Sequence, residues 1–196
     1  MKKLLIVFSA VALVATANAQ KGSITFGVKA GANFSMFGGD DNDGFDSKIG
    51  FHAGGVVNIP VSSMFSVNPE VLFSAEGAKM NDDPDDIKYN LGYINIPVLL
   101  QYNNASGFYA ETGPQIGFLI TAKGKVGDES EDIKDSFKST NFSWAIGAGF
   151  KTKSGFGFGA RYALGLGNIV DEEDVDIKQS NIGVGVFYNF GGSKKK

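Results

Sequence analysis

Six residues with ionisable side chains stand at intervals along the chain, each among apolar or small residues. They include the only histidine and the only arginine in the 196 residues. If the fold brings them together, they could form ion pairs, relay protons or ions, or, through the histidine, provide a general acid–base site. The six are Lys29, His52, Glu70, Glu76, Glu111 and Arg161.

These three chemistries make different demands on their surroundings. Buried charges need partners of opposite sign, which favours a structural ion-pair network. A proton or ion path needs water between the groups. Catalysis by His52 needs a nucleophile and an orienting carboxylate, and no Ser/His/Asp motif accompanies this residue. We therefore expect a charge network and no catalytic residue; the path and a rim-site enzyme are the alternatives.

Two runs of acidic residues could attract cations. They are residues 40–44, with the sequence DDNDG, and residues 171–174, with the sequence DEED. Calcium prefers such oxygen ligands, but the first run lacks the glutamate at the twelfth position of an EF-hand loop. A solvated acidic surface that gathers divalent cations weakly is the simpler interpretation, so we expect no metal site. The glycine-rich run 155–160 has no following helix, so its partial match to a dinucleotide fingerprint predicts no cofactor.

The segment 155–167, GFGFGARYALGLG, shows how the chain positions its charged residues. From Phe156 to Leu166 every second residue is large and apolar apart from Ala160, and the residues between are small except Arg161. A period of two predicts a β-strand with two unlike faces. In a soluble sandwich the second face would carry many polar groups. Both patterns are explained if the face with large side chains contacts lipid and the glycine-rich face lines a crowded interior.

Seven further segments alternate in the same way, so we predict an all-β fold, an eight-stranded antiparallel transmembrane up-and-down β-barrel. All six ionisable residues fall on the face opposite to the apolar one. A Lys or Arg facing lipid at mid-depth costs about 2–4 kcal/mol, which accounts for this segregation. Each segment can cross a tilted bilayer, and closure removes exposed strand edges. The predicted strands are residues 23–33, 49–59, 65–75, 93–102, 108–120, 141–150, 155–167 and 181–190.

The connections alternate between short turns and long loops. The long loops, residues 34–48, 77–88, 121–138 and 167–178, hold almost all of the acidic residues. With eight strands both termini lie at the short-turn end, and we expect the acidic loops on the extracellular side. Pro69, Pro97 and Pro114 fall inside predicted strands, where each removes a ladder hydrogen bond, so we expect bulges or strand ends there.

The first 19 residues predict a secretory signal peptide. They combine a basic start, an apolar run too short for a membrane-spanning helix and a small-residue end at Ala17-Asn18-Ala19. We expect the barrel at residues 20–190 and a basic C-terminal tail at residues 191–196. The chain has no cysteine, which excludes disulfides and thiolate metal sites.

Phrases spread over nearly all of the mature chain carry a family resemblance. They include GVKAGANFS (27–35), PEVLFSAEGAK (69–79), YINIPVLLQY (93–102) and GFYAETGPQIGFLITAK (107–123). Together they resemble the PorT-like outer-membrane β-barrel family of Bacteroidetes. The resemblance implies a small barrel in the cell outer membrane. The chain departs from bacterial barrels at its end, because Phe190, which would be the usual terminal aromatic residue, is followed by six more residues.

The expected function is structural or interaction-based. Candidate roles are envelope integrity, surface recognition and support of protein secretion. The expected partners are outer-membrane lipid and envelope or secretion proteins, without nucleic acid, and we expect a monomer. The alternatives are a narrow ion or solute pore, a rim-site outer-membrane enzyme and a secreted lipocalin-like binder.

Overall fold

The computed structural model describes four stretches of the chain, residues 23–39, 44–80, 87–172 and 176–190. The predicted signal peptide at 1–19 and the basic tail at 191–196 lie outside the described residues and stay predictions. Residues 40–43 of the first acidic run and residues 173 and 174 of the second also lie outside them.

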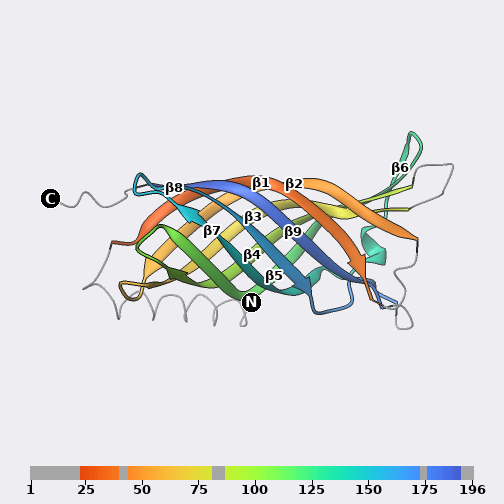
Figure 1. Ribbon diagram of the computed structural model, residues 1–196. Helices are drawn as coiled ribbons and strands as arrows, with labels where there is room; N and C mark the ends of the chain where they lie inside the picture. The colour runs from red at the N-terminus through yellow and green to blue at the C-terminus, as the bar shows by residue number, and fades with distance from the viewer. Residues whose placement is uncertain (1–22, 40–43, 81–86, 173–175, 191–196) are drawn as a thin grey trace.

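Eight long strands form one closed antiparallel barrel, as predicted (Figure 1). The order around the barrel is β4-β3-β2-β1-β9-β8-β7-β5, and pairing of β4 with β5 closes it. The start of β1 and the end of β9 lie at the short-turn end, where Phe26 is opposite Phe190. The barrel strands are β1 (Thr25–Gly38), β2 (Phe45–Pro60), β3 (Phe65–Met80), β4 (Lys88–Asn103), β5 (Phe108–Val126), β7 (Thr140–Lys151), β8 (Phe156–Gly165) and β9 (Lys178–Phe190).

A ninth strand lies outside the barrel wall. β6 (Glu129–Asp132) pairs with the last residues of β5 and forms a hairpin that projects from the loop end (Figure 1). The short 3-10 helix η1 (Lys134–Ser136) follows it. None of the helical segments in the described residues has the length and hydropathy of a membrane-crossing helix.

The barrel wall extends farther toward the loop end than the alternation predicts. β1 continues to Gly38, β3 to Met80 and β5 to Val126, so the predicted ends at residues 33, 75 and 120 are wrong. The reason is that ladder hydrogen bonds join backbone groups whatever side chains the strands carry. The long connections are therefore partly sheet.

The three prolines lie in strand interiors, and the expected bulges or strand ends are wrong for all three. Pro69 is opposite Val98, Pro97 opposite Gln115 and Pro114 opposite Trp144. The register of the β3–β4 and β5–β7 ladders is the same before and after them, and the shift in the β4–β5 ladder lies at Gly92 and Tyr93. The sheet thus tolerates each missing N–H without a change of register.

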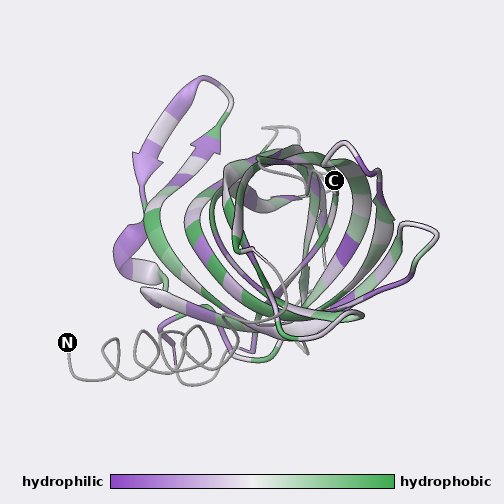
Figure 2. Ribbon diagram, turned by 90° about the vertical axis from the view of Figure 1, so that its left-hand side faces the viewer, coloured by the Kyte–Doolittle hydropathy of each residue, from purple (hydrophilic) through white to green (hydrophobic). Residues whose placement is uncertain are grey.

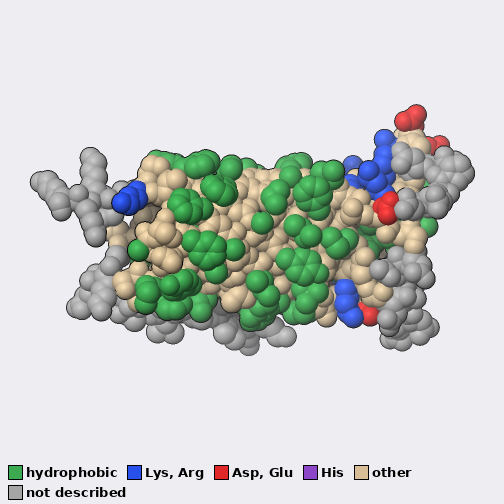
Figure 3. Space-filling view, viewed as in Figure 1, with side chains coloured by type: hydrophobic (Ala, Val, Ile, Leu, Met, Phe, Trp, Pro, Cys, Tyr) green, Lys and Arg blue, Asp and Glu red, His purple; other side chains and the backbone are tan. Residues whose placement is uncertain are grey.

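The outer wall carries the large apolar side chains that the alternation assigned to it. Figure 2 shows hydrophobic and hydrophilic residues alternating along the strands, and Figure 3 shows apolar side chains spread over the barrel wall on the face in view. These side chains have no protein partner over much of their surface; Ile146 is 60% exposed and Phe26 63%. Other exposed members are Val28, Phe51, Val71, Phe142, Trp144, Phe156, Phe158, Leu164, Val184 and Val186.

A second apolar group packs inside the barrel at the loop end. Part of it comes from the strand extensions, and part from the β8–β9 connection, where Ile169 is fully buried. Backbone hydrogen bonds hold this connection in place: Ile169 N donates to Ile177 O at 2.8 Å, and Lys138 N donates to Ile169 O at 2.8 Å. We call this group the loop-end cluster; its buried members are Phe37, Ala78, Leu91, Tyr93, Leu119, Ala122, Ile169 and Ile177.

Glycines on β7 and β8 make room for an aromatic ring inside the short-turn half of the barrel. Tyr109 of β5 is buried and lies over the paired residues Gly149 and Gly159. A Cβ atom on Gly159 would lie 2.2 Å from the Tyr109 hydroxyl oxygen. The Tyr109 ring also contacts Phe187, with ring centroids 5.8 Å apart. Small residues on the inner face are therefore a packing requirement of the inward aromatic rings.

We expect Gly159→Ala to lower the free energy of unfolding by about 1–3 kcal/mol, because the added methyl group overpacks the interior. Gly55→Ala is the matched control, since its Cβ would meet nothing closer than Gly27 O at 4.0 Å, and we expect it to be near neutral. Urea unfolding in lipid vesicles measures both. Adding Tyr109→Phe should recover part of the loss; equal losses in the two glycine variants would contradict this packing.

Candidate functional site

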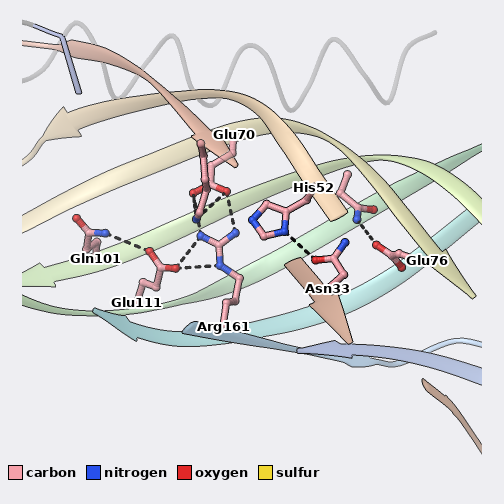
Figure 4. A network of polar contacts seen from close by, with 9 residues as sticks. Asn33, His52, Glu70, Glu76, Gln101, Glu111 and Arg161 are labelled. Carbon is pink, nitrogen blue, oxygen red and sulfur yellow. Dashed lines mark hydrogen bonds and ion pairs between the residues drawn. The ribbon is translucent and has the colours of Figure 1, made fainter. Parts of the chain in front are cut away.

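Four of the six predicted residues meet in the middle of the lumen (Figure 4). Arg161 of β8 contacts Glu70 of β3 through Nη1 to Oε2 at 2.7 Å and Nη2 to Oε1 at 2.8 Å. The same guanidinium donates to Oε1 of Glu111 on β5, from Nη2 at 2.6 Å and from Nε at 2.9 Å. Lys29 of β1 donates to Oε1 of Glu70 at 3.1 Å. We call these four residues the central network.

The central network ties together strands that are not neighbours in the sheet. β3 and β8 lie on different sides of the barrel, so the Arg161–Glu70 contact crosses the lumen. The two carboxylates are buried, with side-chain exposures of 5% for Glu70 and 4% for Glu111, and Arg161 is largely buried at 11%. Two cations and two carboxylates balance in formal charge. The planar guanidinium suits this role because it can bind two carboxylates at once.

His52 lies in the lumen but forms a separate hydrogen-bonded group. Its Nδ1 donates to Oδ1 of Asn33 at 2.7 Å, and Nδ2 of Asn33 donates to Oγ of Ser74 at 2.7 Å. His52 is 7% exposed. Its ring is oriented by an amide instead of a carboxylate, and the hydrogen-bond partner of its Nδ1, the Asn33 amide oxygen, is not a nucleophile.

Glu76 lies nearer the loop end, and amides surround its carboxylate. Asn95 donates to Oε1 at 2.8 Å, and Gln179 donates to Oε2. Within the described residues no ion pair joins Glu76 to a Lys or Arg side chain. The alternation places Asn33 and Asn95 on the inner face, but Gln179 precedes the predicted strand 181–190. Sequence reasoning missed Gln179 because the extension of β9 was not predicted.

Two small cavities flank the central network. They have volumes of about 50 and 20 Å³, and Lys29, Tyr109 and Glu111 line both. The larger one also touches His52 and Arg161. By the rule that one water needs at least about 10–15 Å³, these spaces suit a few water molecules.

The described residues hold no group of three or more His, Asp or Glu side chains suited to a metal ion. Of the second acidic run, Asp171 and Glu172 are described, and both are exposed. The polar contacts observed in the lumen are ion pairs and hydrogen bonds.

The comparisons with known proteins agree with this geometry. Residues 18–171 match the family model described as "Outer membrane protein beta-barrel domain". Neisserial surface protein A is similar in structure, with a TM-score of 0.56, 15% sequence identity, and coverage of 86% of this chain and 100% of that one. Ail, the attachment invasion locus protein of Yersinia pestis, has a TM-score of 0.50 and 18% identity, covering 87% of this chain and 100% of that one. At these identities the likeness concerns the fold. Among curated proteins, none matches the chain.

The family model covers most of the chain, and its barrel is the fold that the structure shows. The exposed apolar band then faces the hydrocarbon of the outer membrane, and the central network lies inside the barrel at membrane depth. The chain belongs to the outer membrane protein beta-barrel domain family.

Proposed function

We propose that this protein is a closed, non-conducting barrel with a structural or interaction role in the outer membrane. The observation that carries the proposal is the filling of the lumen at two levels. The central network crosses the middle, and the loop-end cluster, with Ile169 and Leu91 buried in it, fills the end at which the long loops emerge. An eight-stranded barrel is just wide enough for side chains to fill.

Planar-bilayer recording tests the proposal. We expect the purified protein to give no steady single-channel openings, with a general porin in the same bilayer as the positive control. Openings of constant amplitude would contradict the closed lumen.

The narrow pore remains the second candidate, because the two cavities lie next to charged residues along the barrel axis. The Arg161→Met variant separates the two functions. If the central network is the gate of a pore, the variant should conduct more readily than the wild type. If the loop-end cluster closes the barrel independently, both should be silent.

We propose no enzymatic activity. The support is the position of His52, which is buried with Asn33 and Ser74 instead of standing at a rim. Lipid or peptide turnover by the wild type that disappears in His52→Ala would contradict this proposal. Membership of an outer-membrane family argues against the secreted lipocalin-like binder.

The sequence resemblance to the PorT-like barrels of Bacteroidetes supports the location and fold more than a particular activity, so the more specific role is a separate proposal. We propose envelope integrity, surface recognition or support of protein secretion, carried out by a monomer that displays its acidic loops outward. Deletion of the gene, followed by assays of detergent sensitivity and of secreted protein, distinguishes the first role from the last. Surface recognition predicts accessibility of the loop-end hairpin, β6, to an added protease in intact cells.

A further inference from the structure

Lysines form a row across three neighbouring strands at the loop end of the barrel. Lys79 of β3 is directly opposite Lys88 of β4, and Lys88 is directly opposite Lys125 of β5. Directly opposed residues in antiparallel strands project from the same face, with Cβ atoms about 4.5–5.5 Å apart. Their neighbours Ala78 and Ala122 point into the loop-end cluster, so the lysines lie on the outer face.

Like charges directly opposite each other destabilise a sheet, so a row of this kind favours a nearby anion. Two acids lie opposite lysines at its margins: Asp46 is opposite Lys79, and Asp132 of β6 is opposite Lys123, which shares the outer face with Lys125. Even so, within the described residues no ion pair joins Lys79, Lys123 or Lys125 to a carboxylate. The lysine row could therefore bind an anion that is not part of the sheet.

The position of the row relative to the membrane indicates which anion. Figure 3 shows lysine side chains beside the loop-end edge of the apolar band. On β5, Ile120 is an exposed apolar residue and Lys123 follows three residues later. A lysine lays its hydrocarbon stem along apolar surface and holds its ammonium group at the level of the lipid headgroups. Anionic headgroups attract such lysines.

We propose that Lys79, Lys88, Lys123 and Lys125 form a binding surface for the phosphate groups of anionic lipids in the leaflet at the loop end. Opposed pairs such as Lys79 and Lys88 are close enough for two ammonium groups to contact one phosphate. Binding of the phosphate offsets the mutual repulsion of the lysines that it contacts.

The first experiment measures lipid selectivity directly. The barrel is reconstituted in phosphatidylcholine, and the association of spin-labelled phosphatidic acid is compared with that of spin-labelled phosphatidylcholine. We expect a preference for phosphatidic acid that falls about fivefold in Lys125→Gln, since one lysine near the surface contributes about 1 kcal/mol. Lys138→Gln removes the same charge from the loop end but not from the row, and should keep the preference. An unchanged preference in Lys125→Gln would overturn the proposal.

The second experiment separates lipid phosphate from the chain's own acids and from free phosphate. The competing partners are Asp82, Asp83, Asp85 and Asp86, in the connection between β3 and β4 that lies outside the described residues. The triple variant Lys79→Gln/Lys88→Gln/Lys125→Gln is unfolded with urea in phosphatidylcholine vesicles with and without phosphatidic acid, after gel migration with and without boiling has verified that it folds.

We expect the triple substitution to change the urea midpoint in opposite directions in the two lipids, or to change it only when phosphatidic acid is present. In phosphatidylcholine the triple variant should unfold at the same urea concentration as the wild type or a higher one, and with phosphatidic acid at a lower one. An equal loss in both lipids would assign the lysines to the loop aspartates and overturn the proposal. If inorganic phosphate added to phosphatidylcholine raises the wild-type midpoint as much as phosphatidic acid does, the assignment to lipid is overturned.

Discussion

Arg161→Met is expected to lower the free energy of unfolding by about 3–5 kcal/mol, because it leaves buried carboxylates without their main cation. Glu70 loses two contacts, at 2.7 and 2.8 Å, and Glu111 loses two, at 2.6 and 2.9 Å. Lys29 still contacts Glu70, so the unpaired charge falls mainly on Glu111. Urea unfolding in lipid vesicles measures the loss.

The control removes all four charges of the central network together. In Lys29→Met/Glu70→Leu/Glu111→Leu/Arg161→Met no ion of the central network is left buried without a partner, and replacing buried ion pairs by hydrophobic groups of similar volume is often close to neutral. We expect this variant to recover most of the loss seen in Arg161→Met. A fourfold variant less stable than the single one would show that the pairs themselves stabilise the barrel, contrary to this account.

The second large effect is expected on the outer wall. Ile146→Arg, at the centre of β7, should cost about 2–4 kcal/mol in a bilayer, because the guanidinium would enter hydrocarbon. Ile146 is 60% exposed in the isolated chain, and an exposed residue of a water-soluble protein would tolerate the change within about 0.5 kcal/mol. The expected loss therefore depends on lipid.

Val126→Arg is the matched control for Ile146→Arg. Val126 is also β-branched and is 46% exposed, but it lies in the hairpin with β6, opposite Glu129. We expect a change within about 0.5 kcal/mol there. Unfolding in vesicles measures both, and equal losses at the two positions would contradict a lipid-facing wall around Ile146.

The sequence was enough to predict the strands at membrane depth, because both faces there obey simple rules. Lipid excludes charge from the outer face, and closure of the barrel makes the two faces alternate. A period of two therefore places Phe158 on the outer face and Arg161 on the inner face. The same pattern placed Glu70 and Glu111 inside. It did not reveal which inward residues meet, because contacts across the lumen depend on the register of every strand between them.

The loop end could not be predicted in the same way. Ile169 and Ile177 come from a connection with no periodicity, and their burial is decided by the barrel mouth that they cover. Two large apolar residues within the predicted strands depart from the alternation. Leu99 and Phe187 turn inward; Leu99 is fully buried, and Phe187 packs edge-on against Tyr109. For Phe187 the packing partner comes from a strand that is not its neighbour, and no local signal predicts it.

The central claim is that the alternate bulky side chains of the outer wall contact lipid tails. Trp144 is the single tryptophan, it is 44% exposed on β7, and its Nε1 donates to Oγ1 of Thr112 at 2.9 Å, so its polar group is satisfied without water. The most direct test is quenching of its fluorescence in vesicles of acyl-chain-brominated phosphatidylcholine. The account predicts strong quenching by the brominated chains and little by aqueous iodide. Strong quenching by iodide, with none by the brominated lipid, would contradict it.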